Sequence, residues 1–128
     1  MKFHHIGYLV KNLNRYMKLS NLDKKDLKSF SDPVQEADLH LVNLPEGYIE
    51  LIVPWKNSKL DKEIEKKKDG FHHICYITET ADSYNSFILN AIKVSGPHMS
   101  VMFDCEIEFY YKKGIIIEIV KNYEQKVN

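Results

Sequence analysis

The chain contains an internal repeat with an offset of 68 residues, which constrains its fold more than any other sequence feature. Residues 4–9 (HHIGYL) recur as residues 72–77 (HHICYI), and residues 49–51 (IEL) recur as residues 117–119 (IEI). His5 and Glu50 therefore correspond to His73 and Glu118, and each pair is 45 residues apart. Self-similarity at a fixed offset predicts two copies of one structural module. Because both copies keep an imidazole and a carboxylate, we expect one site built from the two modules.

The composition is that of a compact globular domain. At 128 residues the chain is long enough to bury a core, and its 18 Lys and Arg residues balance its 18 Asp and Glu residues. A neutral chain has no net field to attract nucleic acid or an anionic membrane. No apolar run approaches the roughly 20 residues of a membrane span, and no secretory signal opens the chain. We therefore expect a cytoplasmic protein that binds neither nucleic acid nor membranes.

The same order of local patterns occurs in both halves. The first half predicts a strand at 2–10, a helix at 12–19, a strand near 27–30 and a hairpin of strands at 37–44 and 48–54. The second half predicts a strand at 71–78, a helix at 81–92 capped by Thr80, and strands at 100–103, 106–111 and 115–120. Gly96-Pro97 predicts a break, and Lys112-Lys113-Gly114 predicts the last turn.

These elements predict an α+β fold of two tandem βαβββ modules. We expect one domain over residues 1–128, with module one at about 1–56 and module two at about 70–122. A charged helix within about 57–69 links the modules. Open sheet edges in the two modules favour a homodimer.

Strand alternation indicates which side chains share a face. In each copy of the repeat, His5 or His73 projects from the face opposite to the histidine before it. Glu50 and Glu118 each lie between two apolar residues, so each carboxylate projects from the face opposite to those neighbours. Placing a carboxylate in an apolar strand is costly unless its face is solvated or the charge is paired or bound to a metal. A single such glutamate is explained by a solvated face, but two at matching positions favour binding.

The four repeated residues are candidate ligands of one divalent metal ion. Two imidazoles and two carboxylates from His5, Glu50, His73 and Glu118 suit Zn, Ni, Co, Mn or Fe(II), with water completing the coordination. The alternative is a repeat that survives only for folding. No organic cofactor is expected, and His4 and His72 are expected to make structural hydrogen bonds.

The chain resembles the vicinal oxygen chelate superfamily, which includes glyoxalase I, methylmalonyl-CoA epimerase, extradiol dioxygenases and bleomycin-resistance proteins. The best-matching segments are residues 4–13, 48–54, 70–76 and 114–120. The resemblance implies paired modules whose sheets curl around a metal-lined cleft, with metal ligands at His5, Glu50, His73 and Glu118. A carboxylate at Glu50 is expected in the isomerase and epimerase branch rather than in the dioxygenases.

By this resemblance the expected chemistry is proton transfer next to a carbonyl whose oxygen the metal binds, as in lactoylglutathione lyase or methylmalonyl-CoA epimerase. Glu118 is the first candidate for the base and Glu50 the second. His40, on the strand before Glu50, and Trp55, just after that strand, are candidate contacts to a small-molecule substrate. The alternative function is metal-free binding of a small molecule, as in bleomycin-resistance proteins.

The sequence does not determine the substrate. Residues 103–109 are acidic where methylmalonyl-CoA epimerases carry a glycine-rich segment with a lysine. Arg15 is the only arginine, and no arginine for a glutathione carboxylate is apparent. Both a glutathione hemithioacetal and an acyl-CoA therefore stay as candidate substrates.

Overall fold

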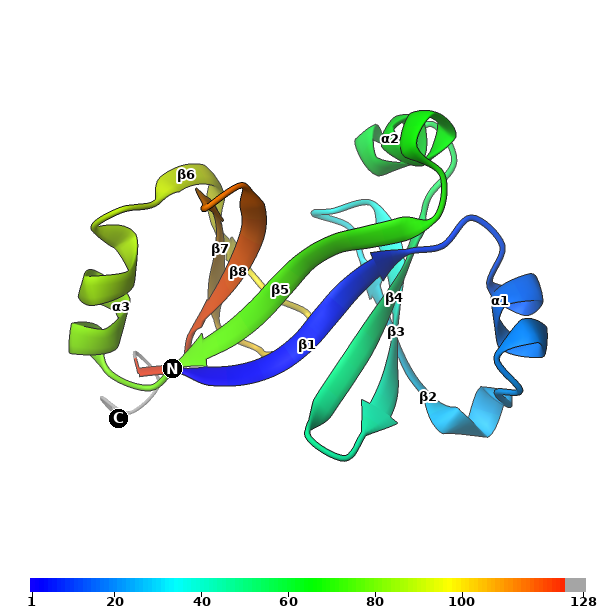
Figure 1. Ribbon diagram of the computed structural model, residues 1–128, viewed down its shortest axis with the longest axis horizontal. Helices are drawn as coiled ribbons and strands as arrows, with labels where there is room; N and C mark the ends of the chain where they lie inside the picture. Colours follow the sequence, from blue (N-terminus) through cyan, green and yellow to red (C-terminus); the bar gives the residue numbers. More distant parts are fainter. Residues whose placement is uncertain (124–128) are drawn as a thin grey trace. The chain divides into compact units, whose positions relative to one another are not determined.

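The computed structural model describes residues 1–123 of the protein (Figure 1). Its elements, in chain order, are β1 (Lys2–Leu9), α1 (Leu13–Leu19), the 3-10 helix η1 (Lys24–Asp26), β2 (Leu27–Asp32), β3 (Ala37–Leu44), β4 (Gly47–Pro54), α2 (Lys59–Lys67), β5 (Gly70–Thr78), α3 (Ala81–Ile88), β6 (Ile92–Met99), β7 (Glu106–Lys112) and β8 (Ile115–Lys121). The protein is α+β, and the predicted order of a strand, a helix and three strands occurs twice. Within the described residues, no helix has the length and apolar character needed to cross a membrane.

The chain forms two compact units. One comprises residues 1–5 together with the residues from 73 onward, and the other comprises residues 6–72. In the first unit the hydrogen-bonded strand order is β1-β5-β8-β7-β6, and in the second it is β2-β3-β4-β1. Strand β1 appears in both orders because the division between the units falls within it, between His5 and Ile6. The division also falls within β5, between His72 and His73.

The sheet of the unit with residues 1–5 and 73 onward has two different faces. Helix α3 lies beside this sheet (Figure 1), and its Phe87 packs on one face with Tyr110, Ile117 and Ile119. On the other face lies a second cluster, formed by Cys75, Cys105, Ile107, Phe109 and Val120. Glu118 pairs with Phe109 across the antiparallel strands β7 and β8, so it belongs to the face opposite α3.

The unit of residues 6–72 is built around the β3–β4 hairpin. Its buried residues include Leu39, Leu41, Leu51 and Ile52. The helices begin where side chains replace missing backbone partners: Asn12 accepts from the N–H of Arg15 at the start of α1, and Ser58 accepts from the N–H of Asp61 at the start of α2. Ile64 is the buried residue of α2.

The predicted turn between the last two strands is confirmed. Lys112 pairs with Ile115, so Lys113 and Gly114 form a two-residue connection. Their φ angles are 53° and 83°, the left-handed values that a type I′ hairpin turn requires at both positions.

Three predictions in the second half are wrong. Helix α3 ends at Ile88 rather than Ile92, although Ala91 still packs against the same core cluster as Phe87. The apolar spacing therefore continued past the end of the helix. Residues 92–99, which include the predicted break at Gly96-Pro97, form β6, whose recorded pairing partner is β7. Proline is tolerated there because an edge strand leaves some backbone N–H positions without a partner strand.

The predicted strand at residues 100–103 is instead a turn. The Ser100 hydroxyl accepts from the backbone N–H groups of Met102 and Phe103, and the Ser100 carbonyl accepts from the N–H of Asp104. A serine side chain that satisfies nearby backbone donors favours a turn over a strand.

Gly96 is required by its surroundings. Its φ is +106°, and a Cβ atom there would lie 2.8 Å from the carbonyl oxygen of Ile107 and 3.0 Å from the Cα of Glu108. We predict that Gly96→Ala destabilises the protein by about 2–3 kcal/mol, since backbone strain and a backbone clash act together. Denaturant unfolding measures this, with Gly70→Ala as the control because a Cβ at Gly70 meets nothing within 4 Å. Equal stabilities of the two variants would contradict the prediction.

A buried carboxylate on β7 is held by three hydrogen-bond donors. Lys93 Nζ lies 2.8 Å from Glu108 Oε2, Tyr110 donates to Oε1 at 2.9 Å, and Tyr84 donates to the same oxygen. Burial by itself would raise the pKa of Glu108, but these hydrogen bonds outweigh it and lower the pKa below 4.5. The ionised form is therefore favoured in the folded state.

This network predicts a pH-dependent stability. Because the folded pKa of Glu108 is lowered, its stabilisation is complete above about pH 4.5 and is lost as the pH falls through the folded pKa. The difference in unfolding free energy between wild type and Glu108→Gln should therefore shrink on acidification below that value. Parallel pH profiles for the two proteins would show that Glu108 does not act in this way.

Candidate metal centre

Three strands of one compact unit bring three of the four repeated residues together. His5 lies on β1, His73 on β5 and Glu118 on β8, and their exposed fractions are 0%, 0% and 4%. His5 and His73 lie on the faces opposite to His4 and His72, as predicted, and both occupy buried positions of their strands. The parallel register of β5 and β8 sets Glu118 beside Cys75, two residues after His73 on the same face.

The three side chains meet at three atoms. His5 Nε2 lies 3.1 Å from His73 Nε2, His73 Nε2 lies 3.1 Å from Glu118 Oε1, and His5 Nε2 lies 3.2 Å from the same oxygen. Two imidazole nitrogens and one carboxylate oxygen thus form a nearly equilateral triangle. These residues form one of the groups of side chains that could hold a metal ion.

The separations of these atoms suit a divalent cation. Bonds of about 2.1 Å at right angles place two neighbouring ligand atoms about 3.0 Å apart, and tetrahedral bonds place them about 3.4 Å apart. The observed separations of 3.1–3.2 Å lie between these values. Hydrogen bonds alone explain the triangle less well, because each imidazole N–H points at one acceptor and at least one edge would lack a proton.

The electrostatics favour an anionic ligand at Glu118. Burial by itself would raise the pKa of this carboxyl, but the hydrogen bonds and charges of His5 and His73 outweigh it and hold the pKa well below 4.5. Glu118 is therefore ionised at neutral pH. A cation that enters the group meets a negative charge already in place, in a site largely shielded from water.

His4 contacts the other nitrogen of His5. The two Nδ1 atoms are 2.7 Å apart, and the ring of Phe103 packs edge-on against His4 and parallel to His5. Burial, and then the charge of His5, lowers the pKa of His4 to about 4, so His4 is neutral at pH 7. The tautomers decide which of the two nitrogens carries the proton of this contact. When it lies on Nδ1 of a neutral His5, the Nε2 atom of His5 presents a lone pair to the group. His4 thus contacts a side chain rather than only the backbone.

A second group shares His5. Ligand atoms of His4, His5 and Cys75 lie within 4.8 Å of one another. A thiolate with two imidazoles prefers softer ions than a carboxylate with two imidazoles does. Of the two groups, that of His5, His73 and Glu118 is the one that combines histidine with glutamate, the two ligand types that both halves repeat.

Glu50 belongs to the other compact unit, and its role as fourth ligand stays a prediction. It is buried, with an exposed fraction of 2%, and Ile52 on the same face of β4 is also buried. The explanation of Glu50 by a solvated strand face therefore does not apply.

The two candidate substrate contacts, His40 and Trp55, also lie in the unit of residues 6–72. His40 pairs with Leu51 across the hairpin, whereas Leu41 pairs with Glu50, so His40 projects from the face opposite to Glu50. Its Nδ1 lies 2.7 Å from Ser29 Oγ. Trp55, 37% exposed, donates from Nε1 to Asp38 at 2.9 Å. Both side chains have structural partners, and their substrate contacts stay predictions.

The sequence interpretation missed Phe103 as a neighbour of the histidines. Its predicted place was in a strand, whereas the turn after Ser100 carries it to His4 and His5. The turn recurs in module one, where Asp32 accepts from the backbone N–H groups of Val34 and Gln35, but the residue at the position of Phe103 is Gln35, so the repeat does not mark Phe103. The doubled histidine at residues 4–5 was the available signal for the contact between His4 and His5.

A family model described as the Glyoxalase/Bleomycin resistance protein/Dioxygenase superfamily matches residues 4–88, more than half of the chain. The chain belongs to this superfamily. The matched range contains three of the four predicted ligands of this glyoxalase-superfamily protein and ends before Glu118. No curated protein matches the chain.

Solved structures share the fold. Methylmalonyl-CoA epimerase from Streptomyces coelicolor, a variant in complex with 2-nitronate-propionyl-CoA, has a TM-score of 0.75 at 20% identity and covers 94% of this chain and 93% of that chain. The epimerase from Mycobacterium tuberculosis has a TM-score of 0.74 at 18% identity, covering 93% and 86%. A hypothetical protein from Bacillus halodurans has 0.73 at 20%, covering 93% and 92%. At these identities the similarity shows a glyoxalase-like fold of two tandem modules.

We predict that His73→Ala lowers the affinity for Zn²⁺ or Co²⁺ by more than the roughly 10–100-fold that loss of an outer-shell partner costs. His72→Ala is the matched control, because this neighbour on β5 projects from the opposite face. Isothermal titration and elemental analysis of the purified variants measure the loss, and His5→Ala should behave like His73→Ala. A metal content unchanged by either ligand variant would contradict the assignment.

Proposed function

We propose that this glyoxalase-superfamily protein is a metal-dependent lyase or isomerase/epimerase that transfers a proton next to a substrate carbonyl group. The observation that carries the proposal is the meeting of His5 Nε2, His73 Nε2 and Glu118 Oε1 within 3.2 Å in a buried group. A buried carboxylate against two imidazoles is costly as a purely structural device, and it is well suited to a cation.

In this proposal His5, His73 and Glu118 hold the metal, and Glu50 is the fourth ligand. Zn, Ni, Co, Mn and Fe(II) all accept this set of nitrogen and oxygen ligands. When bound, the cation would supply positive charge that stabilises the negative charge developing on a substrate carbonyl oxygen, an effect of several kcal/mol. No organic cofactor is part of the proposal.

Glu118 is the proposed base. Its Oε1 faces both imidazoles, and its Oε2 accepts no hydrogen bond from another residue of the described chain. One oxygen can therefore hold the carboxylate in place while the other accepts a proton from the substrate carbon and returns it. The low pKa of Glu118 keeps it ionised but makes it a weak base, so the reaction depends on strong acidification of the substrate carbon. Glu50 is the second candidate for the base.

The proposed substrate is a small molecule with an acidic carbon beside a carbonyl, either an acyl-CoA thioester or a glutathione hemithioacetal. One structural neighbour is methylmalonyl-CoA epimerase in complex with methylmalonyl-CoA, at 19% identity and a TM-score of 0.75, which makes the thioester the first substrate to test. His40 and Trp55 are proposed substrate contacts, and a homodimer is the proposed assembly.

Metal-free binding of a small molecule is the second candidate function, because the matching family also includes bleomycin-resistance proteins. A binder of this kind has no need of a buried group of two imidazoles and a carboxylate. Loss of ligand binding on treatment with a chelator would separate the metal-dependent enzyme from the metal-free binder.

We predict that Glu118→Gln reduces turnover by about 10²–10⁴-fold, the usual contribution of a positioned base, while the folded structure is kept. Exchange of the substrate α-proton with D₂O, followed by NMR, measures the proton transfer directly for methylmalonyl-CoA and for the methylglyoxal–glutathione hemithioacetal. Glu106→Gln is the control, since Glu106 lies outside the group at the start of β7.

An active Glu118→Gln enzyme would exclude Glu118 as the base and would direct attention to Glu50. Absence of exchange with both substrates in the metal-loaded wild type would remove these two substrates from the proposal. Equal exchange before and after removal of metal would contradict the metal-dependent mechanism itself.

A further inference from the structure

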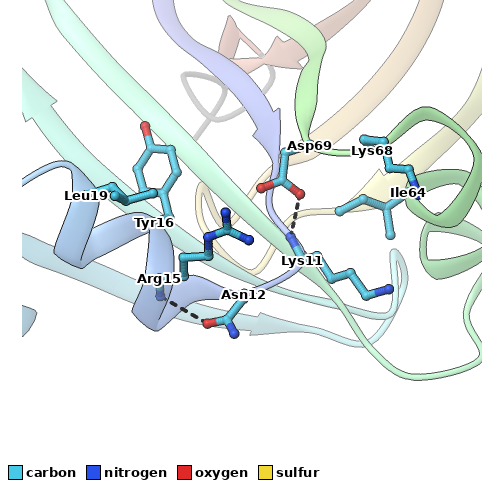
Figure 2. Close-up of a pocket in the computed structure, with 8 residues that line it drawn as sticks. All are labelled: Lys11, Asn12, Arg15, Tyr16, Leu19, Ile64, Lys68 and Asp69. Carbon is cyan, nitrogen blue, oxygen red and sulfur yellow. Dashed lines mark hydrogen bonds between the residues drawn. The ribbon is translucent and has the colours of Figure 1, made fainter.

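A cavity of about 710 Å³ lies within the unit of residues 6–72, outside the metal centre (Figure 2). Helix α1 contributes Arg15, Tyr16 and Leu19 to its wall, and Ile64 of α2 and Lys68 just after α2 contribute further side chains. Its volume falls within the roughly 300–1,000 Å³ of typical small-molecule sites. The wall is thus part apolar and part cationic.

Two charged residues of the wall are already engaged. The carboxylate of Asp69 accepts from the backbone N–H of Lys11 at 3.0 Å, which joins the end of β1 to the start of β5. The ammonium group of Lys11 forms an ion pair with Glu65 of α2. Asn12 likewise uses its side-chain oxygen to cap α1. Lys11 and Glu65 thus neutralise one another, whereas Asp69 keeps its negative charge at the wall of the cavity.

Two cations of the wall are not neutralised in this way. Within residues 1–123, neither the guanidinium of Arg15 nor the ammonium of Lys68 has a recorded carboxylate partner. Figure 2 shows the Arg15 side chain extending from α1 toward Lys11 and Asp69. The only arginine of the chain thus lies at the wall of the cavity, on the side of Asp69, with which it forms no ion pair within residues 1–123.

Lys68 occupies a backbone conformation that favours glycine. As the residue that ends α2, it has φ of +65° and ψ of −174°, and glycine is the usual residue after a helix when φ is positive. A lysine held there is strained, and strained residues cluster at functional sites. The strain concerns the backbone of Lys68, and the lack of a carboxylate partner within residues 1–123 concerns its side chain at the wall of the cavity.

We propose that this cavity binds a phosphorylated small molecule, with the phosphate group between Arg15 and Lys68 and the apolar body against Tyr16, Leu19 and Ile64. A phosphate monoester carries a charge of about −1.5 to −2 at neutral pH, which matches two unpaired cations. The planar guanidinium fork of Arg15 offers two parallel N–H donors to phosphate oxygens. This proposal does not depend on the proposed function of the metal centre.

The test is an NMR titration of the ¹⁵N-labelled full chain with AMP, inorganic phosphate, adenosine and succinate. Saturable shifts with AMP at the cavity residues, weaker ones with phosphate, and none with adenosine or succinate would support the proposal. No saturable shifts with AMP or phosphate, or equal binding of succinate or adenosine, would overturn it. Shifts confined to residues outside the cavity would also overturn it.

Two variants test whether the guanidinium of Arg15 binds the phosphate group. Arg15→Gln should weaken AMP binding at least about tenfold, whereas Lys18→Gln, on the same helix but outside the wall, should leave it unchanged. An equal loss in both variants would indicate nonspecific charge attraction and overturn the proposal.

Lys68→Gly separates binding from stability. Glycine relieves the positive-φ strain, so the variant should unfold at a higher temperature while it binds AMP more weakly. A more stable variant with unchanged AMP affinity would show that Lys68 is not a phosphate ligand and overturn its assigned role.

Discussion

The structure of the candidate site depends on one costly contact, the burial of the Glu118 carboxylate against the imidazoles of His5 and His73. Removing a carboxylate from water costs several kcal/mol unless hydrogen bonds or opposite charges replace the solvent. Here both imidazoles approach the same oxygen at 3.1–3.2 Å, and the ionised carboxylate is favoured as a result. The remaining features of this unit, namely the strand register and the burial of one sheet face, keep these three groups in contact.

The two faces of this sheet separate folding from chemistry. Helix α3 and its aromatic contacts cover one face, and Glu108 on that face is fully supplied with donors from Tyr84, Tyr110 and Lys93. Glu118 projects from the other face, where its neighbours are histidines. Two glutamates on adjacent strands therefore have opposite roles because alternation sends one toward tyrosines and the other toward imidazoles.

Much of the fold could be predicted from the repeat and from short-range patterns. The offset of the doubled histidines predicted two modules, and alternation predicted that the two histidines of each pair lie on opposite faces of their strand. The turn at Lys113-Gly114 followed from residue types that tolerate positive φ. The end of α3 and the position of β6 could not be predicted, because Ala91 keeps the helical spacing although it lies outside the helix.

Contacts that form only through tertiary packing could also not be predicted from the sequence. Phe103 reaches the histidines through a turn that Ser100 stabilises with its own hydroxyl, and no periodic pattern encodes that path. The cavity beside α1 depends on where α2 ends relative to α1, which sequence spacing does not give. For Glu50, His40 and Trp55 the sequence supplies a hypothesis of function, and the structure supplies burial and local partners.

The path of β6 has a consequence for how copies of the protein can associate. Pro97 has no N–H to offer a further strand, and the pairing of β6 with β7 is interrupted by shifts in register on both sides of Ser95. A continuous ladder of hydrogen bonds cannot extend across such a border. Intermolecular sheet growth, the usual route from an open strand to fibrous aggregates, is therefore blocked at this border, and any self-association there must rely on side chains.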